Sequence, residues 1–580
     1  MNSDVFNLRV VSDFNIETLG RYLDNEACWP RVKTANAPFG QMFPSLLEAA
    51  NGDSDQDFCF IWTTLEGAVP SSRKMLDFDL VDRDALFAEV SYFAECVKKS
   101  HTRFKATFVA SWTLPSFYRG LGILDLQNTT GLRRLTLEMN LALVKALEGS
   151  AGIYVLDSSR WLEVAANPWS PKLWYLSKTP YRSEVFGRTA QELKVAIGTV
   201  LGSTRKLIVV DLDDTLWGGI VGEVGCENIV LGGHDHKGEA FVDFQRALKS
   251  LRNRGILLAI ASKNQEEIAL QAFQKRPEMV LHLEDFAAWR INWHDKAANI
   301  AALASELNLG LQSIVFIDDN PVERARVREA LPEVLVPEWP EDKTSYASTL
   351  LQMNCFDLPQ ITDEDRARTE MYVSAREREK GKAEYQSVED WLHSLETTVT
   401  VEELNESNLP RVVQLLNKTN QMNLSTRRMT GPELSTWLKQ ERRKLWAFRV
   451  RDKFSDSGLT GILSLQVGAD SCRIMDFLLS CRVMGRDIEQ VMLAVAVQCC
   501  RGLGCAELTA KYLETAKNKP CLDFWMKSGF AYSEAENSFS WAAAQPYPVP
   551  SHIELIGLNG DQSECGWFRG QEGNVSPVLL

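Results

Sequence analysis

Residues 207–229, LIVVDLDDTLWGGIVGEVGCENI, place a continuous apolar run directly before a cluster of aspartates. Two similar runs follow, GILLAIAS at 255–262 and SIVFIDD at 313–319. Runs that are apolar at every position, rather than at every second one, are typical of parallel strands buried on both faces. We therefore expect parallel strands here, each ending in polar residues.

A helix is predicted between the last two of these strands, over DKAANIAALASELNLG at 295–310. Ile300, Leu303, Ala304 and Leu307 recur at helical spacing, and Gly310 stands where a C-cap glycine is expected. A helix that connects two parallel strands forms a βαβ unit. The predicted fold of this region is therefore a doubly wound α/β sheet.

Five carboxylates follow two of these strands: Asp211, Asp213, Asp214, Asp318 and Asp319. In a doubly wound sheet the ligand site borders the carboxyl ends of the strands, so we expect these side chains to converge. Converging carboxylates repel one another unless a cation or bound protons offset their charge. Mg²⁺ prefers oxygen ligands of this kind, and the sequence therefore predicts a magnesium site.

Ser262 ends the second strand and Lys296 opens the helix, so the chain presents Asp-x-Asp-x-Thr, Ser, Lys and Asp-Asp in order. In these motifs the sequence resembles the haloacid dehalogenase (HAD) superfamily. The resemblance implies that Asp211 is a nucleophile for phosphoryl groups and that Asp213 is a general acid and base. It also implies a Mg²⁺ site formed by Asp211, Asp213, Asp318 and Asp319. The implied phosphate-binding residues are Thr215, Ser262, Lys263, Asn264 and Lys296.

Longer motifs narrow the resemblance to the FkbH-like family. They are GEAFVDFQRALKSLRNRGILLAIASKN at 238–264, EDFAAWRINWHDKAANI at 284–300, VFIDDNPVERARVR at 315–328, LNKTNQMNLSTRRMT at 416–430, FLLSCRVMGRDIE at 477–489 and KLWYLSKTPYRSEVFGRTAQEL at 172–193. The family resemblance implies transfer of D-glyceryl from 1,3-bisphosphoglycerate to the phosphopantetheine thiol of an acyl carrier protein, with loss of phosphate, in polyketide-type biosynthesis.

Holding a glyceryl group between donor and carrier calls for a thiol on the enzyme. Cys226 lies on the glycine-rich segment that follows the first aspartates, and Cys481 lies in the motif SCRVMGR. Both are candidates for the acyl-carrying residue, and each also fits the role of a small structural residue. The other ten cysteines are expected to be core residues.

Residues 398–545 resemble the GNAT acyltransferase fold, with strand-like runs, a turn at 482–487 and a helix after it. The turn has Asp487 where glycine or alanine is usual, and a carboxylate there would repel the pyrophosphate of coenzyme A. We therefore expect this domain to bind the pantetheine arm of a carrier. The predicted carrier-binding residues are Arg427, Arg428, Arg482, Gly485 and Arg486.

The first 197 residues alternate strand-like and helical runs and weakly resemble an SGNH-hydrolase domain. Ser12 follows the first strand, but the usual Gly-Asp-Ser surroundings are missing, so a scaffold or binding role is expected. The full division is an SGNH-like domain at 1–197, a HAD-like catalytic domain at 198–355, a helical linker at 356–397, the GNAT-like domain at 398–545 and a tail at 546–580 with little packed structure.

The composition of the chain limits the kinds of partner that the protein is expected to bind. A formal net charge of -14 argues against a nucleic-acid binder, which needs a basic face. Twelve cysteines without a CxxC pair favour reduced thiols, and neither a signal segment nor a membrane span is recognisable, so we expect a cytoplasmic protein. Two alternatives to glyceryl transfer stay open: a Mg-dependent phosphatase acting on a small phosphorylated metabolite, and a non-catalytic docking protein for carriers.

Overall fold

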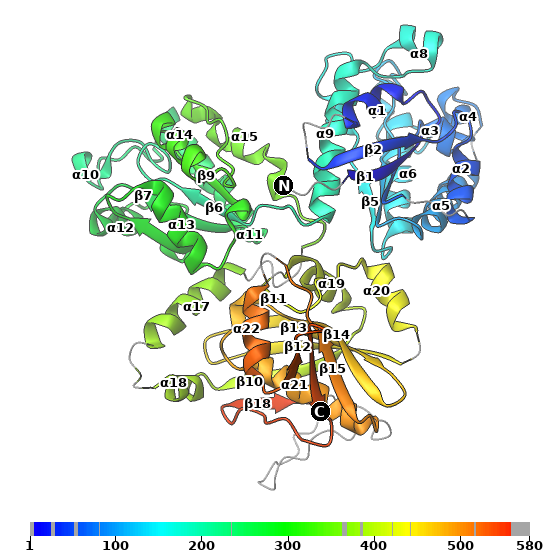
Figure 1. Ribbon diagram of the computed structural model, residues 1–580. Helices are drawn as coiled ribbons and strands as arrows, with labels where there is room; N and C mark the ends of the chain where they lie inside the picture. The colour runs from blue at the N-terminus through cyan, green and yellow to red at the C-terminus, as the bar shows by residue number, and fades with distance from the viewer. Residues whose placement is uncertain are drawn as a thin grey trace. The chain divides into compact units, whose positions relative to one another are not determined.

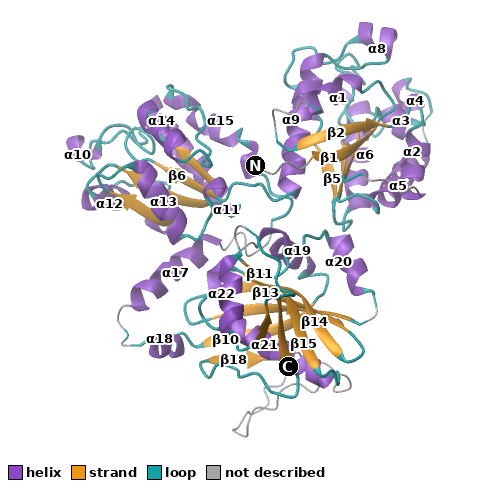
Figure 2. Ribbon diagram, viewed as in Figure 1, coloured by secondary structure: helices purple, strands orange, loops and turns teal. Residues whose placement is uncertain are grey.

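The computed structural model describes residues 5–24, 29–51, 56–80, 82–233, 235–361, 368–382, 385, 387–419, 421–440, 442–515 and 518–557. The chain divides into two compact units, Met1–Gly202 with Thr430–Pro432, and Ser203–Met429 with Glu433–Leu580. Three sheets with helices packed on them form an α/β multidomain protein (Figures 1 and 2), which confirms the predicted fold class.

The first unit is built on a five-stranded parallel sheet of order β2-β1-β3-β4-β5. Alternate strand residues face opposite layers, because Val11 and Ile61 pack with α2, α5 and α6, whereas Val10 and Phe60 pack with α1 and α9. The elements are β1 (Val5–Val11), α1 (Glu17–Leu23), β2 (Arg31–Asn36), α2 (Met42–Asn51), β3 (Phe58–Ile61), α3 (Leu65–Ala68), α4 (Ser72–Leu76), α5 (Arg83–His101), β4 (Ala106–Ala110), α6 (Leu132–Leu147), β5 (Ile153–Leu156), α7 (Ser159–Leu162), α8 (Pro171–Ser177) and α9 (Ser183–Val200).

The HAD-like domain has a four-stranded parallel sheet of order β8-β7-β6-β9. The central strand β6 is buried at every position, with Ile208 and Val210 facing α11, and Leu207 and Val209 facing α13 and α14. The elements are β6 (Leu207–Val210), α10 (Val221–Val224), α11 (His236–Asn253), β7 (Leu257–Ser262), α12 (Glu266–Lys275), β8 (Phe286–Ile291), α13 (Lys296–Glu306), β9 (Ile314–Ile317), α14 (Pro321–Ala330) and α15 (Tyr346–Leu351).

Helix α13 follows the predicted pattern along its buried face but ends earlier than predicted. Ile300, Leu303 and Leu307 are buried, and the helix ends at Glu306. The residue in left-handed conformation after it is Asn308, with φ 50°, and not Gly310. Asparagine tolerates this conformation better than most residues. The chain therefore leaves the helix through Asn308, and the C-cap prediction at Gly310 is wrong.

The third domain has a mixed sheet of order β16-β17-β15-β14-β13-β12-β10-β18, with β11 paired to β14. Helix α21 connects β14 to the parallel strand β15, and its residues Ile488, Val491, Met492 and Val495 are fully buried, as their spacing predicts. Helix α17 (Arg368–Lys382), in the segment predicted as a linker, packs against β7 and β8 of the HAD-like sheet. The elements of the third domain are α18 (Val388–Ser394), β10 (Thr397–Glu403), α19 (Leu409–Lys418), β11 (Met422–Asn423), α20 (Gly431–Leu438), β12 (Arg443–Arg451), β13 (Asp456–Val467), β14 (Ser471–Leu479), α21 (Ile488–Gly502), β15 (Glu507–Lys511), α22 (Lys519–Lys527), β16 (Ala531–Ser533), β17 (Ser538–Ala542) and β18 (Ile553–Ile556).

The segment predicted as a tail contributes a strand to this sheet. Strand β18 pairs in parallel with β10, from Thr397 opposite Ile553 to Thr400 opposite Ile556. The prediction of little packed structure is therefore wrong for these residues, and the rest of the tail from 558 onward lies outside the described residues. No helix in the described part of the chain is long and apolar enough to cross a membrane.

Candidate active site

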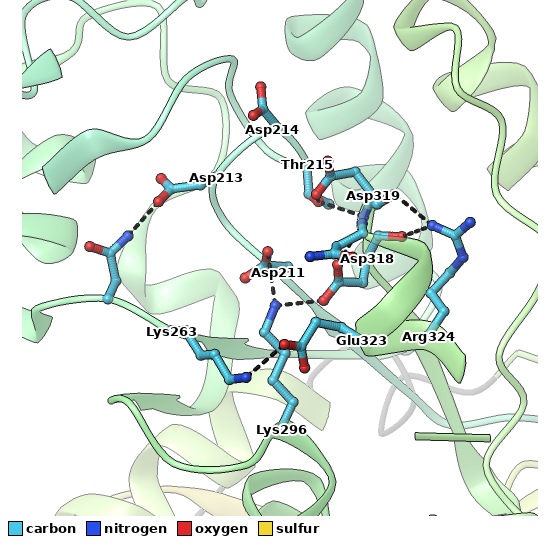
Figure 3. Close-up of polar contacts among 12 residues, drawn as sticks. Asp211, Asp213, Asp214, Thr215, Lys263, Lys296, Asp318, Asp319, Glu323 and Arg324 are labelled. Carbon is cyan, nitrogen blue, oxygen red and sulfur yellow. Dashed lines mark hydrogen bonds and ion pairs between the residues drawn. The ribbon is translucent and has the colours of Figure 1, made fainter. Parts of the chain in front are cut away.

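Three carboxylates meet at the carboxyl edge of the HAD-like sheet (Figure 3). Asp211 follows β6, and Asp318 and Asp319 follow β9, which pairs directly with β6. One carboxylate oxygen from each of the three lies within 4.8 Å of the other two. The parallel pairing of two buried strands thus brings together residues that are more than a hundred positions apart.

Lys296, the first residue of α13, reaches between two of these carboxylates (Figure 3). Its Nζ lies 3.0 Å from Asp211 Oδ2 and 2.6 Å from Asp318 Oδ2. Burial alone would lower the pKa of Lys296, but the two carboxylates raise it above its ordinary value. The lysine is therefore a fixed positive charge in a buried site, as electrostatic stabilisation of a phosphoryl group requires.

The three carboxylates and Lys296 together still carry more negative than positive charge. Burial and the neighbouring Asp211 raise the pKa of Asp318 to about 7. Asp211 Oδ1 is a buried anionic oxygen, and among the residues that the structure describes it has no hydrogen-bond partner. A hard divalent cation would satisfy this oxygen and offset the repulsion, so Asp211, Asp318 and Asp319 fit Mg²⁺.

Asp213 is held apart from these three carboxylates. Its Oδ1 accepts hydrogen bonds from Trp217 Nε1 at 2.9 Å and from the Val221 amide at 3.1 Å, and its Oδ2 accepts from Asn264 Nδ2 at 2.8 Å. Burial raises the pKa of Asp213 above its usual range. A carboxyl group that takes up a proton more readily suits the predicted role in acid–base catalysis.

Two cationic residues of the site were missed by the sequence analysis. Lys343 Nζ donates to the carbonyl of Asp214 at 2.8 Å and lies 3.6 Å from Asp319 Oδ2. Arg324 donates to the carbonyls of Asp318 and Asp319 at 2.8 and 2.7 Å. Both support the loops that carry the aspartates. Arg324 lies in the motif at 315–328, but its pattern does not indicate this role, and Lys343 lies outside the quoted motifs.

Thr215, Lys263 and Asn264, three of the other predicted phosphate-binding residues, also have side-chain partners within the protein. Thr215 Oγ1 accepts from the Asp319 amide at 3.2 Å and donates to Asp319 Oδ1 at 3.3 Å, and Lys263 Nζ pairs with Glu323 at 2.6 Å. Asn264 contacts Asp213, and Ser262 is buried at the end of β7. Their binding of phosphate stays a prediction.

The two candidate thiols differ in their surroundings. Cys226 is buried in the core of the HAD-like domain, and its Sγ contacts the Ile268 carbonyl of α12 at 3.5 Å. In this arrangement the thiol is directed into the core, and acyl capture would require the segment to move. The side chain of Cys481 lies outside the described residues. Neither assignment is tested by the structure.

The predicted carrier-binding arginines are engaged within the third domain. Arg427 pairs with the buried Asp476 through two hydrogen bonds and stacks on Trp437, 4.4 Å from the ring centroid. The others also have partners: Arg428 donates to the Leu416 carbonyl, Arg482 to Ser480, and Arg486 pairs with Asp452, while the Gly485 amide donates to Glu489. All five predicted residues thus have partners within the domain, and their binding of a carrier stays a prediction.

Within the described ranges of the chain, no hydrogen bond joins Ser12 of the first unit to a histidine. It is buried, and its hydroxyl accepts from the Phe14 amide at 3.2 Å. His101, the single histidine in residues 1–197, contacts Thr107 Oγ1 and the Ala151 carbonyl, near the amino ends of β4 and β5. Ser12 follows β1 at the opposite edge, so the Ser–His pair of a serine hydrolase is not formed.

No family model matches the chain, and no curated protein matches it significantly. Among solved structures it is similar to the phosphatase-domain-containing N-terminal part of a Bacteroides fragilis protein complexed with Mg, at 25% identity and a TM-score of 0.54, over 62% of this chain and 95% of that one. Other matches include IAA acetyltransferase from Bacillus cereus (17% identity, TM-score 0.18, 23% and 79% covered) and an Escherichia coli ribosomal-protein-S18-alanine N-acetyltransferase (13%, 0.19, 26% and 96%). Only the first similarity is strong enough to bear on function, and it supports a HAD-like phosphatase domain.

Proposed function

We propose that the protein transfers D-glyceryl from 1,3-bisphosphoglycerate to the phosphopantetheine thiol of an acyl carrier protein, with loss of phosphate, through a thioester on one of its own cysteines. The observation that carries the phosphoryl part of this proposal is the buried group of Asp211, Asp318 and Asp319 with Lys296 between two of them. The acyl part is supported by the FkbH-like motifs in the HAD-like and third domains.

Loading of D-glyceryl from 1,3-bisphosphoglycerate requires the loss of two phosphate groups, and the residues of the site provide a role in each. The 1-phosphate leaves when a cysteine thiolate attacks the acyl carbon and the carbon–oxygen bond to phosphate breaks, with Lys296 stabilising the released phosphate. The 3-phosphate is removed when Asp211 accepts its phosphoryl group, and Asp213 donates a proton to the leaving glyceryl oxygen and later takes one from the attacking water. The two losses can occur in either order. Mg²⁺ held by Asp211, Asp318 and Asp319 would neutralise charge on the phosphoryl oxygens in both.

A second candidate function is that of a Mg-dependent phosphatase for a small phosphorylated metabolite. It is favoured by the similarity to the Bacteroides fragilis phosphatase domain and by the engagement of the predicted carrier-binding arginines within their own domain. In this case the third domain would serve the phosphatase in a way unrelated to carriers.

One experiment separates the two functions. The protein is incubated with 1,3-bisphosphoglycerate, Mg²⁺ and a carrier protein bearing phosphopantetheine, and the carrier is followed by intact mass. A glyceryl adduct that needs the enzyme supports the transfer, whereas enzyme-dependent phosphate release without an adduct supports the phosphatase. If neither product forms, the result supports the non-catalytic docking role.

The cysteine that carries the acyl group is tested in the same assay. Loading is expected to fall below one hundredth in either Cys226→Ala or Cys481→Ala, because the removed thiol forms the thioester. Cys355→Ala is the matched control, since Cys355 is a half-buried cysteine of the HAD-like domain outside the predicted site. Normal loading by both variants would show that each thiol assignment is wrong.

A further inference from the structure

Three buried cysteines of the third domain converge from three parts of the chain. Cys472 lies on β14, Cys500 on the last turns of α21, and Cys505 on the loop that leads into β15. The three sulfur atoms lie within 4.8 Å of one another. This group was not foreseen, because the sequence analysis treated all three as separate core residues.

The backbone fixes the positions of these thiols. Cys472 pairs with Leu508 across the parallel strands β14 and β15, and the Cys505 amide donates to the Cys500 carbonyl at 3.1 Å. Cys500 Sγ donates to the carbonyl of Glu507 at 3.4 Å. Because a strand, a helix end and a hydrogen-bonded turn hold the sulfurs, the group is organised before any ligand binds.

The surroundings of the group are apolar. All three cysteines belong to the hydrophobic core of the domain, with Cys472 and Cys500 fully buried and Cys505 6% exposed. Within the described part of the chain, no further histidine, cysteine, aspartate or glutamate completes the set to four ligands. The donor set is therefore three sulfurs with no oxygen or nitrogen side chain.

We propose that Cys472, Cys500 and Cys505 form a binding site for one soft monovalent metal ion of the Cu(I) class. Thiolate ligands select soft ions, and a structural Zn²⁺ site would need a fourth ligand. With metal–sulfur bonds of about 2.3 Å, a trigonal site spaces its sulfurs by about 4 Å, a spacing compatible with sulfurs that all lie within 4.8 Å of one another. Each thiol that becomes a thiolate ligand releases its proton to the solvent.

Access to the site leads through the loop that carries Cys505. This cysteine is the one member of the group with measurable exposure, and the residues on both sides of it, Gly504 and Ala506, are exposed. Opening of this short loop would bring one sulfur to solvent while Cys472 and Cys500 stay in the core. The ion would thus bind first at Cys505 and then pass to the two inner sulfurs.

The test measures metal binding by the reduced full-length protein. Cu(I) is supplied from a chromophoric chelate, bound copper is quantified after gel filtration, and X-ray absorption identifies its ligands. We expect one ion per chain in an all-sulfur environment, and at least a tenfold loss of affinity in Cys500→Ala and in Cys505→Ala. Cys521→Ala is the matched control, because Cys521 is equally buried in the same domain but outside the group, and it should bind copper as the wild type does.

Several results would overturn the proposal. They are equal copper binding by wild type and both cluster variants, nitrogen or oxygen atoms as the main ligands, or stoichiometric Zn²⁺ binding without Cu(I) binding. The wild-type spectrum identifies the ligand atoms, and the comparison of the two cluster variants with the equally buried Cys521→Ala assigns these atoms to the group. The proposal is independent of glyceryl transfer, since no step of the assay measures activity.

Discussion

At the scale of single residues, Lys343 connects the two aspartate loops of the HAD-like site. It donates to the Asp214 carbonyl and lies 3.6 Å from Asp319. We expect Lys343→Met to weaken Mg²⁺ binding by about 10- to 100-fold, the usual effect of removing a group that orients a metal ligand. The Mg²⁺ concentration for half-maximal phosphate release measures this effect, together with calorimetric titration of the metal.

A substitution of an exposed lysine controls for the loss of one positive charge. Lys275→Met is suitable, because Lys275 is the last residue of α12. In the described part of the chain, the one hydrogen bond of its side chain is to Gln271. It should leave Mg²⁺ binding unchanged. Equal effects of the two substitutions would mean that Lys343 acts through net charge and does not position Asp319.

Asp318 provides a second test at this scale, on stability. As the proposed ligand of the folded site alone, Mg²⁺ at 100 times its dissociation constant should stabilise the wild type by about 2.7 kcal/mol. Asp318→Asn should lose most of this gain, because a ligand and a negative charge are removed. Melting temperatures with and without Mg²⁺ measure the effect, and an unchanged gain in the variant would exclude Asp318 as a ligand.

At the scale of elements, the first turn of α21 contains a buried carboxyl group. Burial raises the pKa of Glu489 from 4.5 to about 7. Below pH 4.5 the group is protonated in both the folded and the unfolded protein, and its contribution to stability does not vary. Between pH 4.5 and 7 the unfolded chain ionises first, so stability falls as the pH rises, by roughly 2–3 kcal/mol in total.

Glu489→Gln should therefore be more stable than the wild type at pH 8 and show little difference at pH 4.5. The gain is reduced by the hydrogen bond that the Gly485 amide donates to Glu489. Calorimetric unfolding across this pH range measures the difference, with the exposed Glu534→Gln as the control. A variant that is less stable than the wild type at pH 8 would contradict this account of α21.

The strands predicted most sharply are those buried on both faces. Strands β6, β7 and β9 are continuous apolar runs, and each is buried throughout. Strand β2 escaped prediction because it lies at a sheet edge and exposes most of its residues. Strand β18 escaped it because its place depends on pairing with β10, which lies about 150 residues earlier in the chain.

The same reasoning explains which site residues could be predicted. Asp211, Asp318 and Lys296 stand next to recognisable strand or helix ends, so their convergence follows from the fold class. The position of Lys343 depends on how the chain after α14 packs against the aspartate loops. The cysteine group likewise depends on strand β14 lying beside β15 and on the return of the chain after α21, which no local pattern indicates.

At the scale of the whole molecule, one chain combines a phosphoryl-transfer site with a domain predicted to bind the carrier arm. The proposed function requires both, because phosphate is lost at one and the acyl group leaves at the other. If the third domain serves loading alone, Arg486→Ala should lower the yield of glyceryl-carrier by at least tenfold while phosphate release persists. Equal losses of both products would mean that the substitution acts on the whole protein.

In the proposed function Asp211 organises the phosphoryl chemistry, which is measured as Mg²⁺-dependent phosphate release from 1,3-bisphosphoglycerate, corrected for the enzyme-free rate. We predict that Asp211→Asn lowers this rate by at least a thousandfold. Asp214→Asn is the matched control, because Asp214 lies on the same loop outside the group of three carboxylates and accepts a hydrogen bond from Gly219 at 3.0 Å. Release by Asp211→Asn at the rate of the Asp214→Asn control would contradict the account.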